Sequence, residues 1–176
     1  MAVCHGFIDE SRRLSGYYVA APVTVADQVG AARAVARGFL LPGQRRWHFT
    51  EESDRRRRTI LTAIARSGLV RVAVAHGSGP DRAVRAECLR QLTPGVLEAG
   101  GPGWSSSPAR GVTIRTARSA LRGVDRPFGY DHLVPAADAA LWLADAVAWS
   151  VSKGGTWREV LAPVIDVDRD IGPITG

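Results

Sequence analysis

The chain has 176 residues, of which 45% are hydrophobic and 23% are charged. This length and composition are typical of one compact globular domain and exclude an intrinsically disordered protein. No apolar run approaches the roughly 18–20 residues that a membrane helix needs, and the charges near the start follow the first apolar run, the wrong order for a signal peptide. Two cysteines are too few for a disulfide framework or a cysteine-ligated zinc site. We therefore expect a single domain over residues 1–176, located in the cytoplasm.

The charge balance of the chain is strongly biased toward arginine. Basic residues number 23 against 17 acidic residues, which gives a net charge of +6, and every basic residue except Lys153 is an arginine. The guanidinium group matches the geometry of phosphate and keeps its charge, so such a surface suits a polyanionic partner. A GC-rich genome, which also favours Ala, Gly and Val codons, would produce the same bias. The composition therefore permits nucleic-acid binding without demonstrating it.

The first elements in chain order form a predicted hairpin and a helix. Residues 3–8 and 17–23 are apolar runs joined by a polar, glycine-containing segment, which indicates two antiparallel strands. Pro22 should place the far end of the second strand at a sheet edge or beyond the ladder. Residues 25–40 have apolar side chains at helical spacing.

The next segment predicts a short strand and a second helix. Residues 46–49 form the strand candidate, and residues 51–67 predict a helix that Thr50 caps, with two acids in its first turn. The buried face of this helix should consist of Ile60, Leu61 and Ile64. Residues 69–75 alternate and predict another strand.

A turn at residues 76–80 leads into a predicted helix over residues 81–97, which Pro94 should end early or kink. Residues 98–110 are rich in Gly, Pro and Ser and predict a surface loop. Residues 111–116 are a further strand candidate, and residues 135–152 are a convincing helix, followed by a short element over 156–165. This order predicts a mixed α/β layer structure.

Two aspartates stand out from the apolar segments that contain them. Asp9 ends an apolar strand, the place where α/β folds usually build their sites. Asp145 lies in a helix whose only other charge between residues 136 and 152 is Asp138, and both share a helical stripe with Trp142 and Trp149. Because an unpaired carboxylate on an apolar helix costs several kcal/mol, Asp145 requires either a metal ion or a buried ion pair.

Several weaker candidates accompany this pair. Glu51 and Glu52 follow His48 and could bind a hard metal, although acids in a first turn are also explained by the helix dipole. The four arginines at 55–58 are typical of a solvated helix face that could contact phosphates. Residues 76–79 (HGSG) resemble a small anion-binding turn but lack the spacing of a nucleophile elbow.

The opening segment and the late helix resemble domain-of-unknown-function family 3800. The resemblance rests on FIDES at residues 7–11 with the hairpin to YYVAA at 17–21, on LWLADAVA at 141–148, and more loosely on His48-Phe49 with Glu52. That family is similar to RNase H-like nucleases. The resemblance therefore implies an α/β fold with a five-stranded mixed sheet, its first three strands antiparallel, flanked by helices.

The activity that the resemblance implies is metal-dependent hydrolysis of phosphodiesters. Carboxylates at a strand end, a helix start and a late helix would converge on one or two Mg²⁺ or Mn²⁺ ions, which activate a water and stabilise the leaving oxygen. The implied catalytic residues are Asp9, Glu52 and Asp145, which are also metal ligands, with Glu10 as a substitute ligand. The expected partner is nucleic acid (RNA, DNA or a hybrid), with Arg12, Arg13, Arg55, Arg56, Arg57 and Arg115 as its contacts and His48, Asp125 and His132 as auxiliary residues.

One position departs from the family pattern and keeps other functions open. RNase H-like enzymes place an acid at the end of the fourth strand, where residues 111–116 have Arg115. Asp125 or Asp131 could supply the acid from the following loop; otherwise the protein binds nucleic acid or a protein partner without cutting. A third hypothesis is a small-molecule hydrolase or transferase, which requires His76 or Ser78 to face a pocket with an acid behind it.

Overall fold

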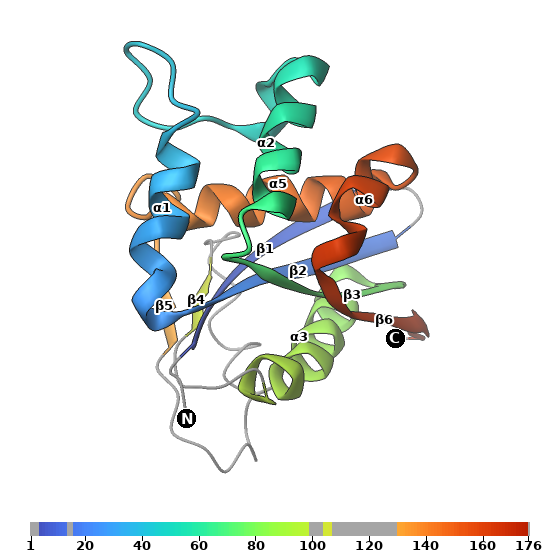
Figure 1. Ribbon diagram of the computed structural model, residues 1–176. Coiled ribbons are helices and arrows are strands. Elements are labelled where there is room, and N and C mark those ends of the chain that lie inside the picture. The colour runs from blue at the N-terminus through green and yellow to red at the C-terminus, as the bar shows by residue number, and fades with distance from the viewer. Residues whose placement is uncertain (1–3, 14–15, 99–103, 107–129, 176) are drawn as a thin grey trace.

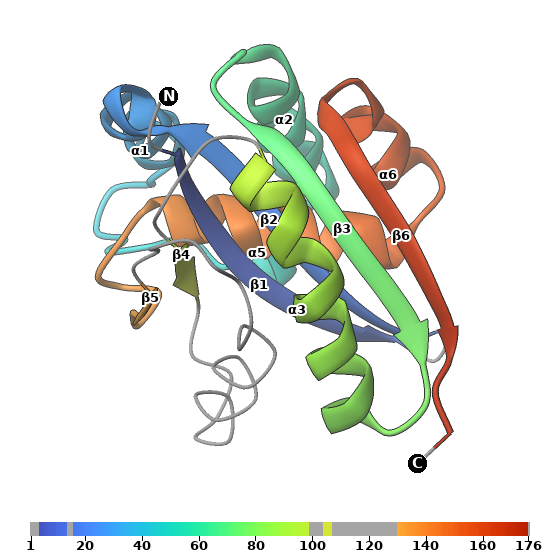
Figure 2. The same cartoon turned by 90° about the horizontal axis from the view of Figure 1, so that it is seen from below.

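The computed structural model describes residues 4–13, 16–98, 104–106 and 130–175. These residues build a six-stranded sheet in the order β5-β4-β1-β2-β3-β6, with helices on both faces (Figures 1 and 2). None of the helices within these ranges is long and apolar enough to cross a membrane.

The first three strands form an antiparallel unit, as expected. The strands are β1 (Cys4–Arg13), β2 (Gly16–Val25) and β3 (Arg71–Ser78), and β2 lies between the other two. The prediction that Pro22 lies at an edge or beyond the ladder is wrong, because Pro22 is inside β2 and faces Val72 of β3. A proline has no N–H to donate, and the β1–β2 pairing is interrupted opposite Pro22, between Gly6↔Val23 and Asp9↔Ala20.

The outer strands are all parallel to their inner neighbours. β4 (Trp104–Ser106) pairs with β1, β5 (Tyr130–His132) pairs with β4, and β6 (Ile165–Pro173) pairs with β3. The prediction of a surface loop over residues 98–110 is wrong at residues 104–106, because these residues form β4. Two predictions lie outside the described residues: the strand at residues 111–116, which contains Arg115, and the role of Asp125.

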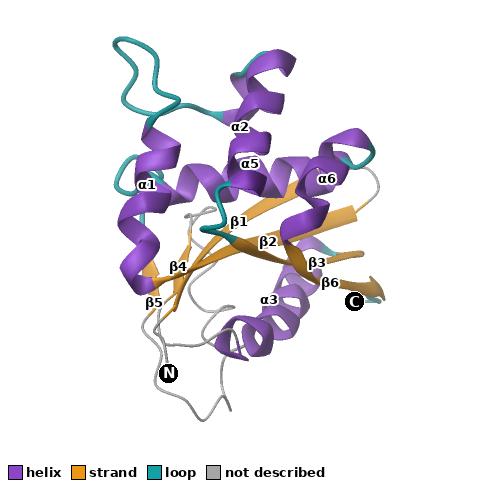
Figure 3. Ribbon diagram, in the orientation of Figure 1, coloured by secondary structure: helices purple, strands orange, loops and turns teal. Residues whose placement is uncertain are grey.

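Within the described ranges, α-helices cover both faces of the sheet, as Figure 3 shows by element type. α1 (Val29–Arg37), α2 (Asp54–Arg66), α5 (Ala140–Lys153) and α6 (Thr156–Leu161) lie on one face, and α3 (Asp81–Glu98) lies on the other. The core under α3 includes Ile8, Val19 and Val84, whereas Ala20, Val74 and Val147 belong to the larger core on the opposite face.

The helix boundaries correct two details of the prediction. Ser53, and not Thr50, caps α2, since its side chain accepts a hydrogen bond from the Arg56 amide. The acids Glu51 and Glu52 therefore precede the helix, although its buried face is the predicted one. α3 also continues through Pro94 to Glu98.

The segment before α2 is not the predicted strand. Trp47 and Phe49 are both buried, which gives the alternation of a strand, but residues 46–48 form a loop that enters the short 3-10 helix Phe49–Glu51. The Trp47 indole N–H donates to the carbonyl of Ala36 at 2.8 Å and so fixes this loop against the end of α1. Its buried aromatic side chains pack among helices instead of along a sheet edge.

Candidate active site

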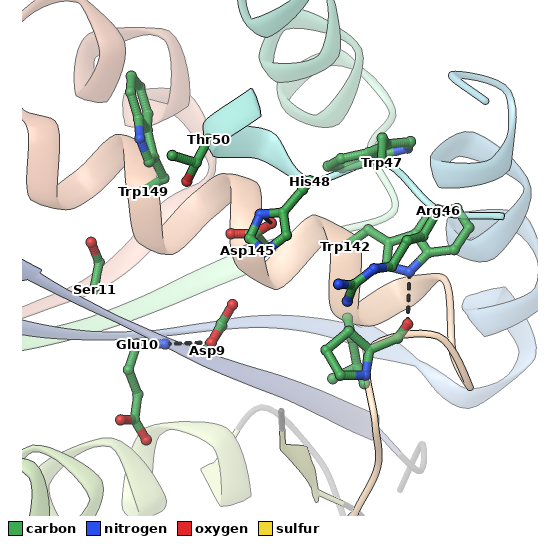
Figure 4. Close-up of a pocket in the computed structure, with 12 residues that line it drawn as sticks. Asp9, Glu10, Ser11, Arg46, Trp47, His48, Thr50, Trp142, Asp145 and Trp149 are labelled. Carbon is green, nitrogen blue, oxygen red and sulfur yellow. Dashed lines mark hydrogen bonds and ion pairs between the residues drawn. The ribbon is translucent and has the colours of Figure 1, made fainter. Parts of the chain in front are cut away.

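The alternation of β1 sends neighbouring side chains to opposite faces of the sheet. Phe7 packs with Leu141 and Ala144 of α5, whereas Ile8 belongs to the core under α3. Asp9 follows the direction of Phe7 and projects toward α5. Glu10 follows the direction of Ile8 and points away from Asp9, as Figure 4 shows.

Asp9 and Asp145 share one pocket. Its volume is about 290 Å³, and it lies between the middle of β1, the loop before α2 and α5 (Figure 4). Asp9 is therefore inside β1 and not at the strand end that the sequence predicted, because the pairing with β2 continues to Arg13. The polar residues that line it are Asp9, Glu10, Ser11, Arg46, His48, Thr50 and Asp145, although the side chain of Glu10 points away from the other carboxylates. The structure thus brings together the strand aspartate and the helix aspartate that the sequence singled out.

The two carboxylates are costly to ionise together. Burial and the neighbouring charge of Asp145 raise the pKa of Asp9 to about 7, although the Glu10 amide donates to its Oδ1 at 2.8 Å. Burial also raises the pKa of Asp145. A pair with this property indicates a functional position, because a purely structural carboxylate is normally neutralised by its surroundings.

The direct polar contacts of Asp145 come from the loop before α2 and not from an arginine. Its Oδ2 accepts a hydrogen bond from the Phe49 amide at 3.1 Å and lies 3.2 Å from Nδ1 of His48, whose side chain is 45% exposed. The buried Asp138, by contrast, receives the guanidinium of Arg33 and the amide of Ala140. Asp138 is therefore a structural residue at the start of α5.

The other two predicted acidic ligands are engaged elsewhere. The carboxylate of Glu10 is buried beneath α3, where it binds Arg85 and accepts a hydrogen bond from the Tyr17 hydroxyl. Glu52, with 7% of its side chain exposed, pairs with Arg56. The structure does not bring either carboxylate to Asp9 and Asp145.

Sequence reasoning missed Arg46, and it preferred Glu52 to Glu51 as the third acidic residue. Arg46 lines the pocket, and its positive charge lowers the pKa of Asp145. Glu51 raises that pKa, so Glu51 is the glutamate whose field reaches the site. The Arg45-Arg46 pair directly before Trp47 was a visible signal, but the segment was interpreted as a strand.

The arginines predicted to contact nucleic acid differ in how many hydrogen bonds and ion pairs they already make within the protein. Arg12 pairs with Asp81 at 3.2 Å, and Arg55 is exposed. Arg56 also donates to the Phe39 carbonyl at 2.7 Å, and Arg57 donates to Phe49 and Thr50 carbonyls and to Asp54, so both hold the structure around the loop. Arg13 lies over the ring of Trp149. His132 ends β5, and its side chain is outside the described part.

The remaining candidates do not add ligands to the pocket. Within the described ranges, no three His, Cys, Asp or Glu side chains form a group able to hold a metal ion by themselves. His76 lies inside β3, stacked on Tyr18 and 3.4 Å from Asp168, and Ser78 ends the same strand. Neither lines the pocket of Asp9, and the predicted anion-binding turn at residues 76–79 is wrong for its first three residues, which belong to β3.

Comparisons with known proteins identify the fold. No family model and no curated protein matches the chain. Bst-RNase HIII in complex with Mn²⁺ superposes with a TM-score of 0.58 at 16% identity, over 85% of this chain and 52% of that chain. The PCNA:RNase HII complex from Archaeoglobus fulgidus gives 0.59 at 14% identity, over 89% and 73% of the two chains. Ribonuclease H2 from Pyrococcus horikoshii gives 0.52 at 11% identity, over 84% and 71%.

These likenesses establish an RNase H-like fold for the chain. The chain spans about half the length of the RNase HIII that it matches. The prediction of a mixed sheet with antiparallel first strands, flanked by helices, is confirmed, although the described residues form six strands and not the expected five. At such low identity the likeness shows fold, and function has to be argued from the site.

Proposed function

We propose that this protein is a metal-dependent phosphodiester hydrolase that cleaves nucleic acid, with its active site in the pocket between β1 and α5. The observation that carries the proposal is the pair of Asp9 and Asp145, two carboxylates from separate elements in one pocket, with a raised pKa on each. The RNase H-like fold supports a nuclease by analogy.

The donor chemistry of the pair fits Mg²⁺ or Mn²⁺. Both ions prefer oxygen ligands, and Mg²⁺ is commonly held by one or two carboxylates together with substrate phosphates and waters. Oδ2 of Asp9 and Oδ1 of Asp145 receive no hydrogen bond within the described part of the chain. A divalent cation would also relieve the repulsion that raises the pKa of Asp9. The pair therefore fits an ion whose other ligands come from the substrate.

Each residue of the site then has a separate role. Asp9 and Asp145 would hold the metal, which supplies an activated water and charge stabilisation at the leaving oxygen. The Phe49 amide and His48 orient Asp145. Neither glutamate completes the site as a third acidic ligand in the described residues: Glu52 is paired with Arg56, and Glu51 acts on Asp145 through its charge without lining the pocket.

The proposal is tested by cleavage assays with labelled single-stranded RNA, single-stranded DNA and a hybrid duplex at millimolar Mg²⁺ or Mn²⁺. We expect cleavage of at least one substrate, and a loss of about 100-fold or more in the Asp145→Asn variant, because it lacks a ligand. Asp27→Asn is the matched control, since Asp27 is exposed and distant in sequence from the pocket residues. A wild-type protein that is inert with both metals on all three substrates contradicts the proposal.

A second candidate function is an RNase H-like module that binds nucleic acid or a protein partner without cutting it. β4, the parallel neighbour of β1, is Trp104-Ser105-Ser106, followed by Ser107, and so ends without an acid. The described residues also lack a three-ligand group. Nucleic-acid binding by a protein that shows no metal-dependent cleavage would favour this module.

We further propose that the chain belongs to domain-of-unknown-function family 3800. The support is that its two motifs, at residues 7–11 and 141–148, contain Asp9 and Asp145, the two aspartates of the pocket. A cytoplasmic location stays a prediction.

A further inference from the structure

The seam between β1 and α5 continues beyond the aspartate pair. On β1, Ser11 and Arg13 follow Asp9 on the same face of the strand, because side chains alternate. On α5, Trp149 and Ser152 follow Asp145 at spacings of four and seven, which keeps them on the same side of the helix. The hydroxyls of Ser11 and Ser152 are 2.7 Å apart, and Nε of Arg13 donates to Oγ of Ser152 at 3.3 Å. A polar line thus leads from the aspartate pair to Arg13.

Arg13 is held in place but keeps free donors. Its guanidinium carbon lies 5.4 Å from the centre of a Trp149 ring, a cation–π contact that orients the plane of the group. Apart from the bond to Ser152, no described residue accepts a hydrogen bond from it, and no described carboxylate pairs with it. Its two terminal amino groups therefore remain available for an anion.

Arg46 occupies the other side of the aspartate pair. In Figure 4, Asp9 and Asp145 lie between Arg46 and Trp149. Residues 41–46 are all exposed, and Arg46 has neither a hydrogen bond nor an ion pair with any residue of the described ranges. It presents at the pocket a guanidinium without a hydrogen-bond partner among the described residues, whereas Arg13 lies farther along the seam.

The arginines of α2 are unsuited to this task. Arg57 has only 16% of its side chain exposed and donates to two backbone carbonyls and to Asp54. Arg56 is divided between Glu52 and the carbonyl of Phe39. Redirecting either guanidinium toward a phosphate would break these bonds, among them those to the partly buried carbonyls of Phe39 and Phe49 and to the buried carboxylate of Glu52.

We infer that Arg13 and Arg46 bind two phosphates of one polynucleotide strand, on opposite sides of the phosphodiester held at Asp9 and Asp145. The polynucleotide lies along the seam of β1 and α5, with its backbone between Arg46 and the indole ring of Trp149. The guanidinium fork can bind a phosphate through two parallel hydrogen bonds, which fixes the position of the strand as well as its charge. This inference rests on the proposed function, since it takes nucleic acid as the substrate.

The test measures binding without metal, so that cleavage cannot contribute. The probes are fluorescein-labelled 12-nucleotide single-stranded RNA, single-stranded DNA and hybrid duplex, titrated in EDTA at several salt concentrations. We expect Arg13→Gln and Arg46→Gln each to weaken binding about tenfold. Each should also lower the slope of log K against log salt by about 0.7 for single strands, because one phosphate contact is lost.

Two variants separate binding from structure. Arg169→Gln is the matched control, since Arg169 is exposed on β6 and donates to Gln91 of α3, away from the pocket. Arg13→Lys retains the charge, so it should keep the salt slope even if the loss of the guanidinium loosens the packing on Trp149. Circular-dichroism melts establish that each variant is folded.

The outcomes distinguish this inference from the proposed function. If Arg13→Gln and Arg46→Gln bind like Arg169→Gln, with the same slopes, the inference is wrong even where the wild type cleaves. If both weaken binding and lower the slope while no metal supports cleavage, the inference holds and the nuclease proposal fails. If none of the three probes binds at low salt, the inference is overturned.

Discussion

At the residue scale, two chemically identical side chains seven positions apart have opposite functions. Asp145 lies within α5, whereas Asp138 precedes its first residue, Ala140, so the two do not share the helical stripe that the sequence predicted. Arg33 and a backbone amide lower the pKa of Asp138, whereas burial raises the pKa of Asp145. The sequence predicted that Asp145 needs a partner, but it could not show that Arg33 would pair with Asp138 and not with Asp145.

The raised pKa of Asp9 predicts a pH-dependent stability. Between about pH 4 and pH 7 the folded protein keeps a proton on Asp9 that the unfolded chain has released, so the free energy of unfolding falls as the pH rises through this interval. In metal-free buffer we therefore expect Asp9→Asn to be more stable than the wild type at pH 8, by about 2–4 kcal/mol. The difference should vanish near pH 4. Urea unfolding at both pH values measures it.

Asp138→Asn is the control with the opposite sign. Because the folded-state pKa of Asp138 is lowered, its carboxylate stabilises the protein above its ordinary pKa and this contribution is lost in acid. The substitution should destabilise the protein at pH 8 by about 1–3 kcal/mol through the loss of its bonds to Arg33. Equal stability of Asp9→Asn and the wild type at pH 8 would show that the Asp9 carboxylate is not repelled there.

Simple alternation also explains which acid of the FIDES motif reaches the site. Adjacent strand residues point to opposite faces, so Asp9 and Glu10 cannot both face α5. This rule was available from the sequence and argued against Glu10 as a substitute ligand. Glu52 and Arg56 are four positions apart, a spacing at which opposite charges often pair. The helix start at Asp54 had to be known from the structure before this pairing could be preferred to a ligand role for Glu52.

At the element scale, the segments with a clear period were predicted and those with tertiary pairing were not. The first hairpin and α5 follow from local patterns of apolar residues. The loop at Trp47 and Phe49 has the same period of two as a strand, yet its side chains pack against α1 and α5. β6 contains Asp166, Asp168 and Asp170, which look unlike a strand until β3 supplies its parallel partner.

The pairing of β6 with β3 depends on a glycine. A Cβ on Gly77 would lie 2.4 Å from Cγ1 of Ile171 and 2.7 Å from the Gly172 carbonyl oxygen. We expect Gly77→Ala to reduce the free energy of unfolding by about 1–3 kcal/mol, because the backbone of β6 has to shift. Gly30→Ala is the matched control, since a Cβ there has no neighbour within 4 Å and alanine favours the helix α1 by up to about 1 kcal/mol.

Both variants are measured by urea unfolding. Because β6 holds none of the pocket residues, Gly77→Ala should leave nucleic-acid affinity unchanged while the protein is folded. A Gly77→Ala variant as stable as the wild type would mean that β6 adjusts without cost.

At the scale of the whole molecule, the sheet order places the site. β1 has β2 on one side and β4 on the other, and α5 crosses the face to which Asp9 points. The aspartates are 136 positions apart, so only the complete layer of strands and helices brings them together. The resemblance to a known family predicted this arrangement, whereas periodicity alone gave the elements without their order.

That arrangement predicts that metal stabilises the whole fold. Asp9 and Asp145 are neighbours only in the native state, so an ion that binds both favours folding by RT ln(1 + [L]/Kd). At a metal concentration ten times Kd, this is about 1.4 kcal/mol, or a rise in Tm of about 3–5 °C for a protein of this size. Mg²⁺ or Mn²⁺ should therefore raise the Tm of the wild type at pH 8, as followed by circular dichroism.

Asp9→Asn should abolish this rise while starting from a higher Tm, because the substitution removes both a ligand and a repelled charge. Asp27→Asn, which alters an exposed aspartate outside the pocket, should respond to metal like the wild type. NaCl at matched ionic strength controls for a general salt effect on the Tm. Ca²⁺ at the same concentration as Mg²⁺ or Mn²⁺ then shows whether another divalent cation also stabilises the protein. If millimolar Mg²⁺ and Mn²⁺ leave the wild-type melting curve unchanged, the pocket does not hold a metal in the free protein. The same melts with the 12-nucleotide probes added would then measure whether metal binds together with nucleic acid.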